Sequence, residues 1–210
     1  MALALTLLKD VRWRGATVTG DRARALLAAL ASAGGRPVPD ERLIELVWGE
    51  DAPANAAKSL QVLVSRTRAA YGADAIVRDG VGYRLGVGPA EVDSGRLSAL
   101  VAEAGAALEE DPARAQGLAR EALALAGGLG DGGSQDTSEQ TSNGAQPADG
   151  TPLAEIRAAA AEHAAEARVV HARASSRLGA HADALPVLEQ AHAAQPDDES
   201  LLADLLRSEA

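Results

Sequence analysis

The chain has 210 residues, enough for two small domains. It contains no Cys, which excludes a disulfide framework, thiol catalysis and cysteine-ligated zinc, and an aromatic content of 2% argues against single-strand binding by base stacking. The net charge of −10 is unevenly distributed along the chain. Residues 1–90 carry 12 Lys/Arg and 9 Asp/Glu, whereas residues 91–210 carry 8 Lys/Arg and 21 Asp/Glu. Only the first part is therefore suited to approach a polyanion.

The first fifty residues predict a small antiparallel sheet followed by two helices. Short strands are expected over 2–8, 11–13 and 16–19. A helix over 21–33 is closed by Gly34-Gly35, and a second helix begins at Pro39-Asp40 and is stopped by Gly49. Trp48, at the end of the second helix, is expected to be half-buried as a lid on the core.

The next predicted helix, over 55–70, has two chemically different faces. Its Ala, Leu, Arg and Gln residues favour a helix, and no Gly or Pro interrupts it. One face is expected to be buried: Leu60, Leu63, Val64, Thr67 and Tyr71. The opposite face carries mostly short side chains with basic groups among them: Asn55, Lys58, Ser59, Val62, Ser65, Arg66 and Ala69.

The outer face of this helix is suited to the major groove of duplex DNA. No acidic residue occurs from position 52 to position 73, although the whole chain is acidic. Short side chains let the helix axis approach the base edges, an Arg can donate two hydrogen bonds to guanine, and a Val can contact a thymine methyl group. A basic helix face taken alone is more often simply solvated, so the residues C-terminal to the helix decide between the two interpretations.

A β-hairpin is predicted directly after this helix. Residues 75–78 and 82–85 read as strands on either side of the Asp79-Gly80 turn signal, with Arg78 and Arg84 flanking the turn. A hairpin in this position can act as a wing that meets a neighbouring phosphate or the minor groove. The glycine spacing does not fit a dinucleotide-binding fingerprint. The order of a sheet, three helices and a hairpin is that of a winged helix.

After residue 90 the chain is expected to be helical. Helices are predicted over 92–108, 113–126, 152–178, 181–194 and from 197 through 206. Pro186 must lie near the start of its helix or kink it. Residues 127–150 are glycine-rich and polar and are expected to form a flexible linker. The predicted domains are therefore 1–90 and 91–210, the second containing the insert 127–150.

The sequence offers no constellation for catalysis. It contains no GxxxxGKS/T phosphate loop, no HExxH motif and no Ser–His–acid order beyond chance. Glu162, His163 and Glu166 could touch one ion, but a solvated helix face is favoured. We therefore predict no catalytic residue, cofactor or metal, and a chain that is not an enzyme. No apolar run is long enough to span a bilayer and the first residues lack the features of a signal peptide, so a cytoplasmic location is expected.

Two stretches resemble a known family. LIELVWGEDAPANAAKSLQVLVSRTRAA and IVRDGVGYRL resemble the OmpR-type winged helix of the SARP antibiotic-pathway activators. HADALPVLEQAHAAQPDDESLL resembles the bacterial transcriptional activator domain of the same family, which is built of tetratricopeptide-like helix pairs. The resemblance extends over 1–126 and, more weakly, over 151–210. It implies an α+β winged helix-turn-helix followed by an all-α tetratricopeptide-like domain, and a chain that is part of a longer regulator.

The resemblance also implies roles for individual residues. The positions that match groove-facing residues of the family are Lys58, Ser59, Val62, Ser65 and Arg66, and Arg68 matches a phosphate contact. The loop proposed to touch RNA polymerase contains Trp48, Gly49, Glu50 and Asp51. The chain departs from the family pattern at Thr67, where an apolar core residue is usual, and at Asp79, where related wings often carry Arg.

Together these features predict a sequence-specific activator that binds duplex promoter DNA. The predicted contacts are Asn55, Lys58, Ser59, Val62, Ser65, Arg66, Arg68, Arg78 and Arg84. The resemblance implies that two protomers bind head to tail on direct repeats and contact RNA polymerase holoenzyme. It also implies control of a secondary-metabolite gene cluster and association with the bacterial nucleoid. The alternative is a protein-interaction adaptor whose acidic helical half is the main functional surface. Retention of residues 1–90 on duplex DNA at low salt would separate the two hypotheses.

Overall fold

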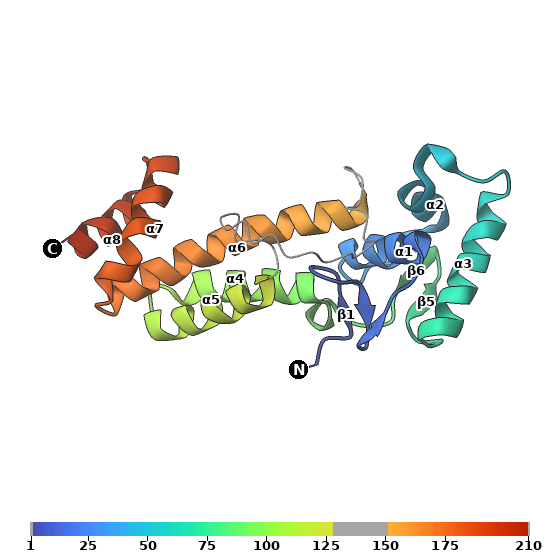
Figure 1. Cartoon of the computed structure of the whole chain (residues 1–210), viewed down its shortest axis with the longest axis horizontal. Coiled ribbons are helices and arrows are strands. Elements are labelled where there is room, and N and C mark those ends of the chain that lie inside the picture. The colour runs from blue at the N-terminus through green and yellow to red at the C-terminus, as the bar shows by residue number, and fades with distance from the viewer. Residues whose placement is uncertain (1, 128–150, 210) are drawn as a thin grey trace, which may run out of the picture. The chain divides into compact units, whose positions relative to one another are not determined.

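The computed structural model describes residues 2–127 and 151–209, which form two compact units (Figure 1). The first unit contains the described residues up to Gly95 together with 151–159, and the second contains Arg96–Gly127 together with 160–209. Residues 128–150 of the predicted linker lie outside the described part of the chain. The domain boundary between residues 90 and 91 stays a prediction.

The first unit begins with the expected antiparallel sheet, in the strand order β1-β2-β3. Its strands are β1 (Leu5–Thr6), β2 (Arg12–Trp13) and β3 (Ala16–Thr17). Each is shorter than predicted. Arg14 and Gly15 both have positive φ, so the chain reverses directly after Trp13. Leu5 and Trp13 pair across the sheet and are both buried, which places the inner face of this sheet in the core.

Three helices and a second sheet complete the winged-helix order in the first unit (Figure 1). The three helices are α1 (Asp21–Ser32), α2 (Asp40–Trp48) and α3 (Ala56–Tyr71), and the short 3-10 helix η1 (Gly49–Asp51) follows α2. The second sheet has the order β4-β6-β5 and consists of β4 (Val38–Pro39), β5 (Ile76–Asp79) and β6 (Gly82–Leu85).

Helix α3 buries the face that the sequence predicts. Leu60, Val64 and Thr67 are buried, whereas Leu63 and Tyr71 are partly exposed. The hydroxyl of Thr67 donates to the backbone oxygen of Leu63 at 2.8 Å, so the polar residue at this core position leaves no unsatisfied donor. The departure from the family pattern is therefore compatible with a closely packed helix.

The hairpin turn lies one residue later than predicted. Asp79 pairs with Gly82 in the β5–β6 register, so the loop consists of Gly80 and Val81 rather than Asp79 and Gly80. Gly80 has a φ of +41°, and glycine adopts such values without a steric penalty. Gly82 is required for packing, since a Cβ there would lie 1.9 Å from the backbone oxygen of Val38 in β4.

Residues beyond position 90 hold the N-terminal segment in place. The buried carboxylate of Asp93 accepts hydrogen bonds from the backbone nitrogens of Leu7 and Leu8, at 2.8 and 3.0 Å. Arg157 donates to the backbone oxygens of Leu7 and Lys9, at 3.1 and 2.5 Å. Burial raises the pKa of Asp93, although these backbone hydrogen bonds act in the opposite direction. The first unit is thus completed by side chains from beyond residue 90.

The described part of the chain after residue 88 is helical, as expected. After the 3-10 helix η2 (Pro89–Glu91), the chain forms α4 (Asp93–Ala107), α5 (Pro112–Ala126), α6 (Pro152–Arg177), α7 (His181–Ala194) and α8 (Glu199–Glu209). Small side chains meet where α4, α5 and α6 pack, at Ala104, Ala119 and Val170. Pro186 lies inside α7.

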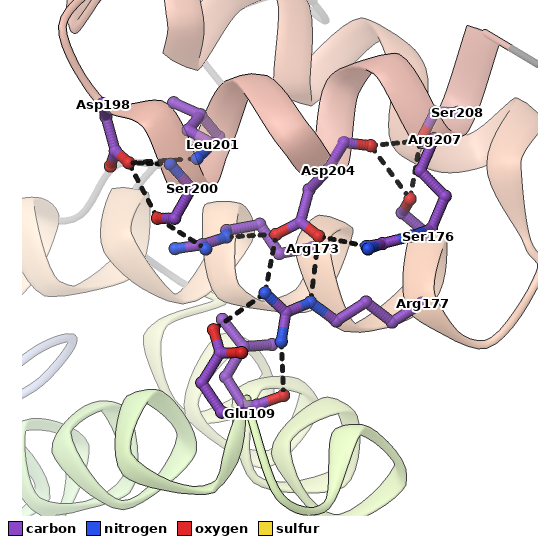
Figure 2. A network of polar contacts seen from close by, with 11 residues as sticks. Glu109, Arg173, Ser176, Arg177, Asp198, Ser200, Leu201, Asp204, Arg207 and Ser208 are labelled. Carbon is purple, nitrogen blue, oxygen red and sulfur yellow. Dashed lines mark hydrogen bonds and ion pairs between the residues drawn. The ribbon is translucent and has the colours of Figure 1, made fainter.

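A buried ionic cluster joins α8 to α6 (Figure 2). The side chain of Asp204 is 1% exposed and pairs with Arg173 at 2.7 Å, Arg177 at 2.9 Å and Arg207 at 2.5 Å. Arg177 also pairs with Glu109, in the loop after α4, at 2.8 Å. Burial acts to raise the pKa of Asp204, but the hydrogen bonds from Arg177 and Arg173 prevail, and its pKa lies below the ordinary value.

Candidate nucleic-acid interface

An open groove of about 480 Å³ lies beside the N-terminal half of α3. Its lining comes from α1, the end of α2 and α3, and consists of Arg22, Trp48, Asn55, Lys58, Ser59, Val62, Leu63 and Arg66. The structure therefore brings together five of the residues predicted to contact DNA and one residue predicted to contact polymerase. Arg22 is a member of the groove that the sequence pattern does not single out.

Local structure explains how Trp48 and Arg22 reach the groove. Helix α2 ends at Gly49, whose φ of +56° turns the chain away and leaves Trp48 half-buried, as predicted. The Nη1 of Arg22 donates to the backbone oxygen of Val47, and its guanidinium lies 5.9 Å from the centre of the Trp48 ring. A cation in the first turn of a helix opposes the helix dipole, so the position of Arg22 in α1 is a sequence signal that could have drawn attention to it.

The outer face of α3 is open to solvent. Lys58, Ser65 and Arg66 are exposed, and Val62 is 41% exposed although it is apolar. Asn55 caps the helix, because its side-chain oxygen accepts a hydrogen bond from the backbone nitrogen of Lys58 at 3.1 Å. Within residues 2–127 and 151–209, no carboxylate lies at ion-pair distance from Lys58 or Arg66.

The two arginines of the hairpin are engaged within the protein. Arg78 contacts both carboxylate oxygens of Asp40, at 2.7 and 2.9 Å, and its guanidinium lies 4.6 Å from the centre of the Tyr83 ring. The hydrogen bond with Asp40 is the main cause of the raised pKa of Arg78. Arg84 pairs with Asp79 at 3.1 Å, so the departure from the family at position 79 supplies this arginine with a partner.

Arg68, the predicted phosphate contact at the end of α3, is engaged as well. Its Nε donates to the backbone oxygen of Ile76 at 2.8 Å, and its guanidinium lies 5.8 Å from the centre of the Tyr83 ring. The structure thus gives Arg68 a structural role between α3 and β5. It does not bring Arg68 into the groove beside Lys58 and Arg66.

The predicted polymerase loop is accessible. Gly49, Glu50 and Asp51 form η1 and are exposed, directly after Trp48. The loop carries two carboxylates, whereas the adjoining groove contains Arg22, Lys58 and Arg66. An acidic loop therefore adjoins a basic groove at Trp48.

The three α6 residues that could touch one ion do not assemble a metal site. His163 lies 3.8 Å from Glu166 within α6, and the described residues contain no group of three His, Cys, Asp or Glu side chains placed to hold a metal. Within the same described ranges, no helix is long and apolar enough to cross a membrane.

The described geometry is that of a winged-helix transcriptional regulator: three helices flanked by two small sheets, with the outer face of the third helix open. Residues 17–85 match the family described as "Transcriptional regulatory protein, C terminal", and residues 92–210, more than half of the chain, match the "Bacterial transcriptional activator domain". The chain belongs to the SARP family of DNA-binding transcriptional regulators. The family and the fold class expected from the sequence are confirmed.

The chain is similar to several regulators over part of their length. It is 36% identical to the regulatory protein AfsR of Streptomyces griseus over 107 residues, which are 49% of this chain and 11% of that protein. It is 32% identical to the transcriptional regulator RedD of Streptomyces coelicolor over 124 residues, which are 55% of this chain and 35% of that protein. The chain therefore spans about a tenth to a third of the length of these relatives.

A solved structure shares the fold. The structure of Mycobacterium tuberculosis EmbR in complex with a low-affinity phosphopeptide superposes with a TM-score of 0.69 at 23% identity, covering 98% of this chain and 54% of that chain. The likeness confirms a winged-helix region followed by an all-helical region.

Proposed function

We propose that this chain binds duplex promoter DNA in a sequence-specific manner through the outer face of α3. The observation that carries the proposal is the groove beside α3, where Lys58 and Arg66 are exposed without a carboxylate partner among the described residues. An exposed cation that no protein group neutralises can replace the counterions of a phosphate backbone. The groove is therefore locally basic, although the chain as a whole has a net negative charge.

The shape of α3 fits the major groove. The helix has 16 residues and is therefore about 24 Å long at 1.5 Å per residue. Ser59 and Ser65 are short, so the helix axis can come close to the base edges. Arg66 would donate two hydrogen bonds to a guanine, and the exposed methyl groups of Val62 would contact a thymine methyl. Lys58, near the N-terminus of the helix, would contact phosphate.

The activating contact in this proposal is made by the loop after α2. Trp48, Gly49, Glu50 and Asp51 would contact RNA polymerase holoenzyme, which is supported by the exposure of η1 and by the acidity of the loop. Two protomers would bind head to tail on direct repeats in the bacterial cytoplasm. The controlled genes would be a secondary-metabolite cluster, an assignment supported by the resemblance to antibiotic-pathway activators.

The test begins with selection of bound sequences from random duplexes, followed by affinity measurements with Arg66→Ala. We expect a motif to be enriched, and Arg66→Ala to lose about 1–3 kcal/mol of discrimination at one base position, because a bidentate contact to guanine is removed. Arg42→Ala is the matched control, since Arg42 is an exposed arginine of α2 that pairs with Glu45 and does not line the groove.

Two results would contradict the proposal. Unchanged affinity and selectivity of Arg66→Ala on the selected duplex would show that α3 does not read bases. Absence of any enriched motif, together with no binding to duplex DNA at low salt, would favour the protein-interaction adaptor instead.

A further inference from the structure

The five basic side chains predicted to contact DNA fall into two groups. Lys58 and Arg66 are exposed in the groove beside α3, and no described carboxylate lies at ion-pair distance from them. Arg68, Arg78 and Arg84 each donate a hydrogen bond to another group of the first unit. The sequence alone does not show which of the five are engaged within the protein.

The engaged arginines of the hairpin are poorly placed for phosphate. Arg78 would have to leave Asp40 and the ring of Tyr83, and Arg84 would have to leave Asp79. Their carboxylate partners remain at the hairpin and repel a phosphate. Asp40, Arg78, Asp79 and Arg84 together carry no net charge, so the hairpin offers a nearly neutral surface to DNA.

Arg22 differs from these arginines because, in the described ranges 2–127 and 151–209, its hydrogen-bond partner is a backbone oxygen and not a carboxylate. The guanidinium of Arg22 uses Nη1 to donate to the backbone oxygen of Val47, and it lies over the ring of Trp48. A guanidinium has five N–H donors, and the Arg22 side chain is exposed at the groove that contains Lys58 and Arg66. Its full positive charge is thus available, and the contact with Trp48 restrains its orientation before any ligand binds.

We propose that Arg22 completes a phosphate-binding subsite for the DNA backbone, in which Lys58 supplies a second cation and Trp48 a wall of the groove. The planar guanidinium is suited to two parallel hydrogen bonds with phosphate oxygens, whereas the Lys58 ammonium acts as a point charge. This inference rests on the proposed function and deepens it. Phosphate binding is concentrated beside α1 and α3, and the hairpin arginines contribute little to it.

The test measures how salt weakens DNA binding by the full chain. The probe is a fluorescein-labelled duplex of random sequence, followed by anisotropy between about 50 and 200 mM KCl, where each phosphate contact contributes roughly −0.9 to the log–log slope. Arg22→Gln should make the slope less steep by about 0.9, because one contact is lost. The thermal midpoint of each variant is measured to show that the fold is kept, and Arg42→Gln is the charge-matched control.

A second variant tests the neutral hairpin. Replacing Asp79→Asn together with Arg84→Gln removes the ion pair without changing the net charge, and the salt slope is expected to stay that of the parent chain. If this double variant reduced the salt slope as much as Arg22→Gln does, the hairpin would contribute a phosphate contact, and the inference that it is a nearly neutral surface would be wrong.

The remaining outcomes separate the inference from the proposed function. If Lys58→Gln weakens the slope and Arg22→Gln does not, the Arg22 subsite is wrong while DNA binding through α3 stands. If the double variant Lys58→Gln with Arg66→Gln binds the duplex as the parent does, DNA binding through α3 is itself wrong.

Discussion

The basic side chains of α3 and α6 are of similar chemistry but lie in opposite electrostatic surroundings. In α6, Arg173 and Arg177 are 14% and 15% exposed and share the buried carboxylate of Asp204. In α3, Lys58 and Arg66 are exposed, and within the described parts of the chain no carboxylate approaches them to ion-pair distance. Arginines on a helix therefore indicate a binding surface only where the fold leaves them without partners.

The largest expected effect tests the α6 side of this comparison. Asp204→Ala leaves Arg173 and Arg177 largely buried without their carboxylate, and we expect the free energy of unfolding to fall by about 3–5 kcal/mol. Urea unfolding followed by far-UV circular dichroism measures the loss. Glu162→Ala, at an exposed position of the same helix, is the control and should change stability by less than about 0.5 kcal/mol. Equal stability of the two variants would show that the cluster does not hold α8.

Acid should weaken the same cluster. Because the pKa of Asp204 in the folded chain lies below its ordinary value of 3.8, the stabilising contribution is complete above pH 3.8 and is lost as the pH falls through the folded pKa. The stability difference between the parent chain and Asp204→Asn should therefore shrink as the pH is lowered below about 3.8. The raised pKa of Asp93 has the opposite effect on the pH dependence of stability, but Asp93 is present in both proteins, so its contribution cancels in the difference. A difference that grows on acidification would contradict this assignment.

The smallest expected effect sharpens the α3 side. Arg66→Gln removes an exposed cation without a described ion-pair partner, so the free energy of unfolding should change by less than about 0.5 kcal/mol. The same urea titration measures the free energy of unfolding. Although stability is expected to change little, the affinity of this variant for the selected duplex should fall. A loss above about 1 kcal/mol would mean that Arg66 is part of the folded core rather than of a binding surface.

Much of the architecture could be predicted because its signals are local. Asn55 and Asp111 cap α3 and α5, Gly49 ends α2, and the glycine after Asp79 marks the hairpin. Such signals act within a few residues, through backbone conformation and capping hydrogen bonds. The turn lies one residue away from its predicted place because cross-strand pairing of Asp79 decides its register.

The partners of the arginines could not be predicted in the same way. Arg78 and Asp40 are 38 residues apart in sequence, and no periodic pattern connects them. The same holds for Arg22, which reaches Trp48 only after α1 and α2 have packed together. The sequence therefore predicts the five basic residues as one set, and their separation into engaged and available cations emerges from tertiary contacts.

The hydrogen bonds of Arg157 to the N-terminal segment have a consequence for the order of events during biosynthesis. The strand β1 leaves the ribosome well before α6, yet the backbone oxygen of Leu7 receives its donor from a residue 150 positions further along. Domains commonly fold as they emerge, but β1 and its neighbours must wait for the start of α6 before these bonds can form. A nascent regulator thus acquires its finished winged-helix unit only after Arg157 has been translated.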